Sequence, residues 1–114
     1  MSEPNKLLVI WSSADKEVAL HNVFMYTHNA KKRDWWKQVR LLIWGPSGTL
    51  LARDEQVQQA LKEMAADGVE ILACKACSDR LEVTDALEQL GVNVFYVGTT
   101  LTEMLKTGWV TLTY

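Results

Sequence analysis

Short apolar runs recur along the chain at regular intervals, and each is rich in β-branched and aromatic residues. Runs of this kind, bounded by polar and turn-forming residues, predict β-strands. The first four are almost uninterrupted, which is typical of strands covered on both faces, whereas the last alternates between apolar and polar residues as an edge strand does. The predicted strands are residues 7–11, 39–44, 69–73, 92–97 and 110–114.

Helical patterns fill the intervals between these runs. Apolar residues recur there at helical spacing, so that one face of each helix would be buried. Gly68 and Gly91 follow two of the patterns as helix-ending residues, and Thr84 marks a break inside the third. The predicted helices are residues 15–32, 53–67, 74–90 and 101–106.

The strict alternation of strands and helices predicts an α/β fold. Right-handed crossovers would give a five-stranded, mainly parallel sheet with helices on both faces. The 114 residues contain no repeat, linker or low-complexity segment, so residues 1–114 are predicted to form a single domain. A chain of this length buries roughly two-thirds of its unfolded surface, which is enough to fold without disulfides or metals.

Composition and charge narrow the classes of function. The net charge of −2 argues against a broad electrostatic surface for nucleic acid. The first apolar run, residues 7–11, is too short for the core of a signal peptide or for a membrane span. We therefore expect a cytoplasmic protein that binds neither nucleic acid nor membrane. Thiols are kept reduced in the cytoplasm, so the two cysteines are interpreted as reactive or metal-binding before a disulfide is considered.

The fold class predicts where a site would form. In an open parallel sheet, ligands bind outside the carboxyl ends of the strands. Ten residues that follow predicted strands are therefore expected to act in or line a site: Ser12, Ser13, Asp15, Gly45, Pro46, Ser47, Cys74, Lys75, Cys77 and Gly98. The first three of these also fit a purely structural role as caps of the first helix.

The strongest candidate for chemistry is the thiol pair after the third strand. Cys74 directly follows that strand, and Cys77 lies in the first turn of the next predicted helix. A cysteine at a helix N-terminus feels the positive end of the helix dipole, which favours the thiolate. Lys75 and Arg80 add positive charge nearby. We predict a reactive Cys74 with Cys77 as a resolving thiol, although free cysteines often serve only to pack the interior.

Other kinds of site fit this pattern less well. A structural zinc site needs four ligands and the thiol pair supplies two, so no metal site is predicted. A thioredoxin-like redox motif would face a cis-proline, and neither Pro4 nor Pro46 is positioned for that role. Residues 45–48 are glycine-rich but match no phosphate-binding motif. We interpret them as a turn, with anion binding through backbone N–H groups left open, and predict no cofactor.

Taken together, these features resemble the DsrE/DsrF-like family of small sulfur-relay proteins. The resemblance rests on the element order, on an early strand followed by a Ser/Asp loop, on the turn at residues 44–47, and above all on residues 72–77. It implies a flavodoxin-like, three-layer α/β/α fold and assembly into homo-trimers or homo-hexamers. It also implies that Cys74 carries a persulfide, received from a sulfur-donor protein and passed to an acceptor. The role of Cys77 rests on its spacing alone.

Three hypotheses of function remain open. The leading one is a sulfur carrier that accepts and passes a persulfide on Cys74, with any enzymatic activity left undecided. The second is an oligomeric, non-enzymatic binding module with a pocket at the carboxyl ends of the strands. The third is a redox switch in which a Cys74–Cys77 disulfide alters assembly.

Overall fold

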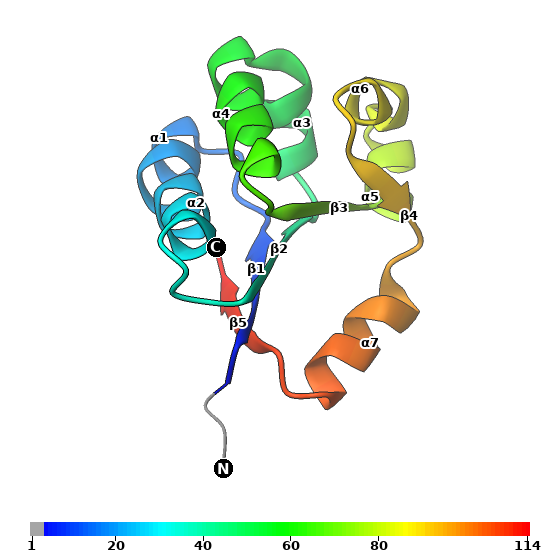
Figure 1. Ribbon diagram of the computed structural model, residues 1–114. Helices are drawn as coiled ribbons and strands as arrows, with labels where there is room; N and C mark the ends of the chain where they lie inside the picture. The colour runs from blue at the N-terminus through cyan, green and yellow to red at the C-terminus, as the bar shows by residue number, and fades with distance from the viewer. Residues whose placement is uncertain (1–3) are drawn as a thin grey trace.

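The five predicted strands form one parallel sheet in the computed structural model, which describes residues 4–114 (Figure 1). The strand order is β4-β3-β2-β1-β5, and every neighbouring pair is parallel. The predicted α/β class is therefore confirmed. The strands are β1 (Lys6–Trp11), β2 (Gln38–Ile43), β3 (Glu70–Cys74), β4 (Asn93–Phe95) and β5 (Val110–Thr113).

Helical segments connect each strand to the next. The helices are α1 (Lys16–Val18), α2 (Met25–Lys32), α3 (Ser47–Arg53), α4 (Glu55–Ala66), α5 (Lys75–Arg80), α6 (Thr84–Gln89) and α7 (Gly98–Lys106), with a π-helical segment η1 (Ala19–Phe24) between α1 and α2. The predicted break before Thr84 is confirmed, because α5 and α6 are separate helices. The prediction missed α3, whose first two residues, Ser47 and Gly48, were assigned to a turn.

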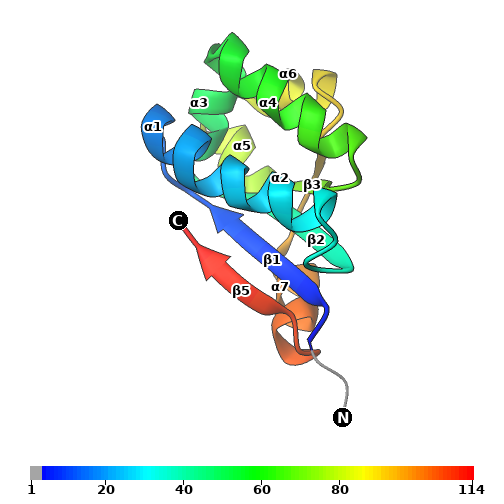
Figure 2. The same ribbon diagram turned by 60° about the vertical axis from the view of Figure 1, so that its left-hand side comes forward.

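The sheet has two unequal faces, and both are covered (Figures 1 and 2). Along β1, Leu7 and Val9 belong to the larger core, together with residues of η1, α3, α4 and α6. Leu8 and Ile10 point the other way, into a smaller core with Met104 of α7. Side chains alternate between faces along a strand, so the continuous apolar run of β1 serves both layers. The three-layer α/β/α arrangement expected from the sequence is confirmed.

The strand order explains why α7 lies apart from the other helices. The first three crossovers move outward from β1 in one direction and place their helices on the same face. The last crossover returns from β4 to β5, on the far side of β1, and right-handed geometry carries α7 across the opposite face. The smaller core, which contains Cys74, is thus covered by α7, and Cys77 of α5 also packs against it.

Two predicted strands end earlier than expected. The strand predicted for residues 92–97 pairs only over β4, because Val97 instead serves as the N-cap residue of α7. The second strand stops at Ile43, and the chain turns at Gly45, whose φ of 77° lies in the left-handed region that glycine adopts without strain. This turn brings the start of α3 beside the end of β3.

Candidate functional site

Cys74 occupies the last position of β3 and the N-cap position of α5. Its register partner on β4 is Phe95, and it shares the smaller core with Leu72 and Val97. Only 8% of its surface is exposed. The Cys74 side chain caps no backbone N–H of α5. The predicted position at a strand end is confirmed, while the expected approach to the helix N-terminus is not made as a hydrogen bond.

Cys77 lies one helical turn later and is half-buried. Both cysteines are free thiols. Burial raises the pKa of the Cys77 thiol, and the contact with Cys74 raises this pKa further. The backbone N–H of Gly45 and the charge of Arg80 act against these effects without reversing them. The Cys77 thiol is therefore protonated at neutral pH.

The turn between β2 and α3 stands next to this pair and is firmly anchored. Ser47 is fully buried, and its Oγ donates a hydrogen bond to the carbonyl oxygen of Trp11 at the end of β1. The Ser47 N–H donates to the Ser12 carbonyl over 3.0 Å, and the Trp44 N–H donates to the Trp11 carbonyl over 3.0 Å. These bonds fix the turn that places Gly45 and Pro46 around one cavity with Cys77.

A small cavity of about 160 Å³ opens at this junction. It is lined by Gly45, Pro46, Cys77, Arg80 and Leu81. Three of the residues predicted from strand-end position are thus brought together by tertiary structure. Arg80 and Leu81 were not predicted as lining residues, although spacings of three and four from Cys77 place them on the same helical face.

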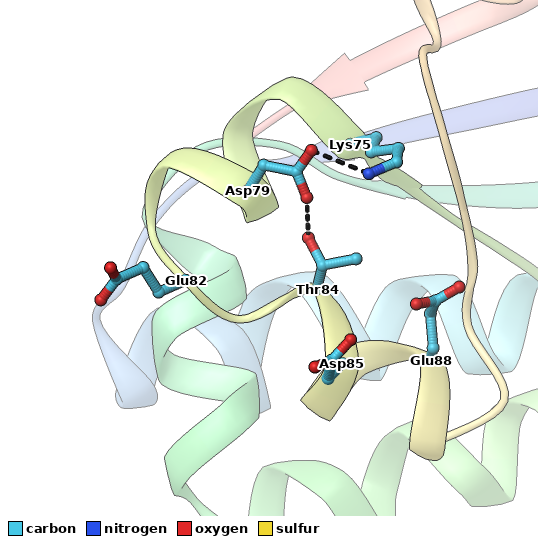
Figure 3. Close-up of a pocket in the computed structure, with 6 residues that line it drawn as sticks. All are labelled: Lys75, Asp79, Glu82, Thr84, Asp85 and Glu88. Carbon is cyan, nitrogen blue, oxygen red and sulfur yellow. Dashed lines mark hydrogen bonds and ion pairs between the residues drawn. The ribbon is translucent and has the colours of Figure 1, made fainter.

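A larger hollow of about 590 Å³ lies over α5 and α6 (Figure 3). Besides Lys75 and Thr84, its lining residues are four acids: Asp79, Glu82, Asp85 and Glu88. Lys75 Nζ donates to Asp79 Oδ2 over 2.8 Å and lies 5.6 Å from the ring centre of Tyr96. The Lys75 bond lowers the pKa of Asp79, and the same bond raises the pKa of Lys75. This hollow contains no thiol, so its size does not make it the chemical centre.

The remaining predicted site residues form hydrogen bonds outside the cavity. Ser12 Oγ donates to the carbonyl of Tyr114 over 2.9 Å, joining the ends of β1 and β5. Ser13 Oγ accepts the N–H of Asp15 over 3.1 Å, and Asp15 caps α1 through the N–H of Glu17 over 2.8 Å. Gly98 begins α7. These four residues do not line the 160 Å³ cavity.

The described part of the chain offers neither a metal site nor a membrane-spanning helix. Within residues 4–114, no group of three or more histidine, cysteine or acidic residues is arranged to hold a metal ion. The helices of the same segment include none with the length and apolar character needed to cross a membrane.

The fold and the site define a class: small α/β/α domains with free thiols at the end of the third strand. The DsrE/DsrF-like family model matches residues 10–114, and the chain belongs to this family. The predicted resemblance is therefore confirmed. No curated protein matches the chain.

Solved structures of the same fold come from bacteria and an archaeon. BT1422 from Bacteroides thetaiotaomicron, described as a conserved protein of unknown function, has a TM-score of 0.93 and 37% identity, covering 96% of this chain and 95% of its own. MTH1491 from Methanobacterium thermoautotrophicum, also of unknown function, has a TM-score of 0.73 and 19% identity, covering 98% and 100%. The ychN protein from E. coli has a TM-score of 0.71 and 18% identity, covering 96% and 99%. The last two show similarity of fold alone.

Proposed function

We propose that this protein is a sulfur carrier that holds a persulfide on Cys74. The observation that carries the proposal is the position of the thiol pair: Cys74 is a buried free thiol at the end of β3, and the free thiol Cys77 follows three residues later in α5. Membership of the DsrE/DsrF-like family supports the same assignment.

The transfer is a thiol–persulfide exchange. The Cys74 thiolate attacks the outer sulfur of a donor persulfide, a new sulfur–sulfur bond forms, and the donor thiolate leaves with the electron pair of the old bond. An acceptor thiolate then removes the outer sulfur from Cys74 in the same way. No external oxidant or reductant is consumed in either step.

The burial of Cys74 suits storage of a reactive group. With 8% of its surface exposed, Cys74 is shielded from small reductants on the side of the smaller core. Cys77 offers a route for discharge. Its thiolate, once formed, attacks the inner sulfur of the persulfide, so that a Cys74–Cys77 disulfide forms and hydrosulfide leaves.

Intact-protein mass after treatment with a persulfide donor tests the proposal. Wild type is expected to gain about 32 Da, the mass of one transferred sulfur atom. Cys74→Ser should lose this gain, and Cys77→Ser should retain it but discharge more slowly. No gain in wild type, or an equal gain in Cys74→Ser, would contradict the proposal. Cys74 that also resists alkylation in the native protein would favour a non-enzymatic binding module.

The carrier role includes partners and a reducing environment. We propose a cytoplasmic homo-oligomer, a trimer or hexamer, that receives and delivers sulfur through donor and acceptor proteins. Light scattering coupled to size-exclusion chromatography measures the oligomeric state directly, and a monomer at micromolar concentration would contradict this assembly.

A second candidate function is a redox switch through the same pair. The specific observation in its favour is that both cysteines are free and that Cys77 packs against the core that contains Cys74. The switch requires reversible oxidation that changes assembly. Identical size-exclusion profiles of the oxidised and reduced protein would refute it.

A further inference from the structure

The 160 Å³ cavity beside the thiol pair has a distinct electrostatic character. Arg80 is the charged residue among those that line it, and its side chain is exposed. Within residues 4–114, Arg80 takes part in none of the ion pairs, whereas Lys16, Arg40 and Lys75 each pair with a carboxylate. An arginine without a carboxylate partner at the mouth of a cavity favours an anionic ligand there.

The nearest acid on the same helix does not neutralise this charge. Asp79 precedes Arg80, but its carboxylate accepts hydrogen bonds from Lys75 and from Thr84 in the neighbouring hollow (Figure 3). The two hollows around α5 therefore differ in sign. The larger one has four acidic side chains against one lysine, while the smaller one has Arg80 and no acid.

The size of the cavity limits what can enter it. A cavity of about 150 Å³ holds one molecule of the size of benzene. The 160 Å³ available here thus suits a small anion and leaves no room for a folded peptide segment. Cys77 lines the cavity, and Cys74 packs in the core against which Cys77 rests, so a ligand in the cavity lies beside the thiol pair.

We infer that this cavity binds a small anionic sulfur donor, of which thiosulfate is the simplest, and that Arg80 determines the preference for the anion. The inference rests on the proposed function for the transfer step and names its donor class. The Cys74 thiolate attacks the outer sulfur of thiosulfate and forms a persulfide. The sulfur–sulfur bond of thiosulfate breaks, and sulfite leaves with the electron pair, so atoms, charge and electrons balance.

Alkylation with two reagents of similar size tests the cavity independently of sulfur transfer. Iodoacetate is an anion and iodoacetamide is neutral, and the modified cysteine is located by peptide mass. We expect Arg80→Gln to lower the ratio of iodoacetate to iodoacetamide rates at Cys77 about fivefold, the scale of an exposed charge–charge contact. Arg80→Lys should keep most of the ratio. Arg53→Gln, at an exposed arginine outside the cavity, should leave it unchanged.

The ratio guards against a trivial result, because a loosened or unfolded variant would accelerate both reagents. An Arg80→Gln variant with the wild-type ratio would overturn the inference. An equal fall of the ratio in Arg53→Gln would also overturn it, because the fall would then be caused by the change in net charge and not by the position of Arg80.

Sulfur loading then tests the donor class. Thiosulfate should load wild type, and Arg80→Gln should load about fivefold more slowly from thiosulfate but at the wild-type rate from an uncharged organic persulfide. Equal rates from thiosulfate in the two proteins would overturn the donor class. If no donor loads wild type, the proposed function fails, and the alkylation ratio still decides whether the cavity prefers anions.

Discussion

The two cysteines lie three positions apart yet occupy different environments. Cys74 takes its orientation from β3, whose alternation places it on the α7 face with Leu72. Cys77 takes its orientation from α5 and faces the turn at Gly45 and Pro46. A strand and a helix therefore meet inside one short motif. This change of secondary structure is what makes one thiol a buried site and the other the wall of a cavity.

The raised pKa of Cys77 depends partly on its neighbour, and this gives a prediction. Cys74→Ala removes both the hydrogen bond and the charge that raise the pKa of Cys77, leaving burial as the main cause. The pKa of Cys77 is thus expected to fall toward its ordinary value. The rate of iodoacetamide modification against pH measures it, and the midpoint should move to lower pH than in wild type. An unchanged midpoint would show that the two sulfur atoms do not interact.

At the scale of elements, helix caps fix the segments that carry the site. Asp54 ends α3 and caps α4, accepting the N–H of Val57 over 2.9 Å, and Lys16 approaches the same carboxylate at 3.0 Å. This one residue therefore links three helical segments: α1, α3 and α4. Its hydrogen bonds with Val57 and Lys16 lower the pKa of Asp54 below its ordinary value of 3.8.

A pH dependence of stability follows from this cap. Because the pKa of folded Asp54 is lowered, its contribution is complete above the pKa of the unfolded state and is lost as the pH falls through the folded value. Asp54→Asn keeps an acceptor for the Val57 N–H but cannot ionise. We expect this variant to lose less stability than wild type when urea unfolding is repeated at about pH 3 instead of neutral pH. Equal losses would contradict the lowered pKa.

The turn between β2 and α3 is a second element on which the site depends. Ser47→Ala removes the buried hydrogen bond to the Trp11 carbonyl and leaves that carbonyl without this donor. The free energy of unfolding should fall by about 1–2 kcal/mol. Thr102→Ala, which removes an exposed hydroxyl bonded within α7, is the matched control and should change it by less. Urea unfolding at neutral pH measures the free energy of unfolding of both variants, and equal losses would contradict a special role for Ser47.

At the scale of the whole molecule, the layered fold could be predicted from the sequence because long-range burial imposes a simple pattern. A strand covered on both faces must be apolar along its whole length, and this pattern is visible in β1, β2 and β3. The start of α3 lacks such a signal. Its first residues, Ser47, Gly48 and Thr49, are poor helix formers, and the helix is fixed by Leu50 and Leu51, which are buried in the larger core.

The candidate site was predictable only in part for a related reason. Strand-end position alone identified Cys74, Cys77 and the turn at Gly45, since topology brings the carboxyl ends of β2 and β3 together. The contribution of Arg80 depends on which way α5 rotates after Cys74 and on the pairing of Asp79 with Lys75. The rotation of α5 is a tertiary outcome that the sequence pattern does not encode, whereas the Lys75–Asp79 pair has a spacing of four within α5 and was open to prediction.

The uneven layering yields a last prediction, at the scale of the molecule. Met104 of α7 is 3% exposed and belongs to the same core as Cys74, while Leu105 beside it is 53% exposed. Met104→Ala should lower the free energy of unfolding by about 2–5 kcal/mol, and Leu105→Ala should change it little. Since Met104 is the buried residue that α7 contributes to this core, Met104→Ala should also speed alkylation of Cys74 under native conditions, well below the unfolding midpoint. Faster alkylation of Cys77 alone would show instead that Cys74 is shielded by the turn at Gly45 and not by α7.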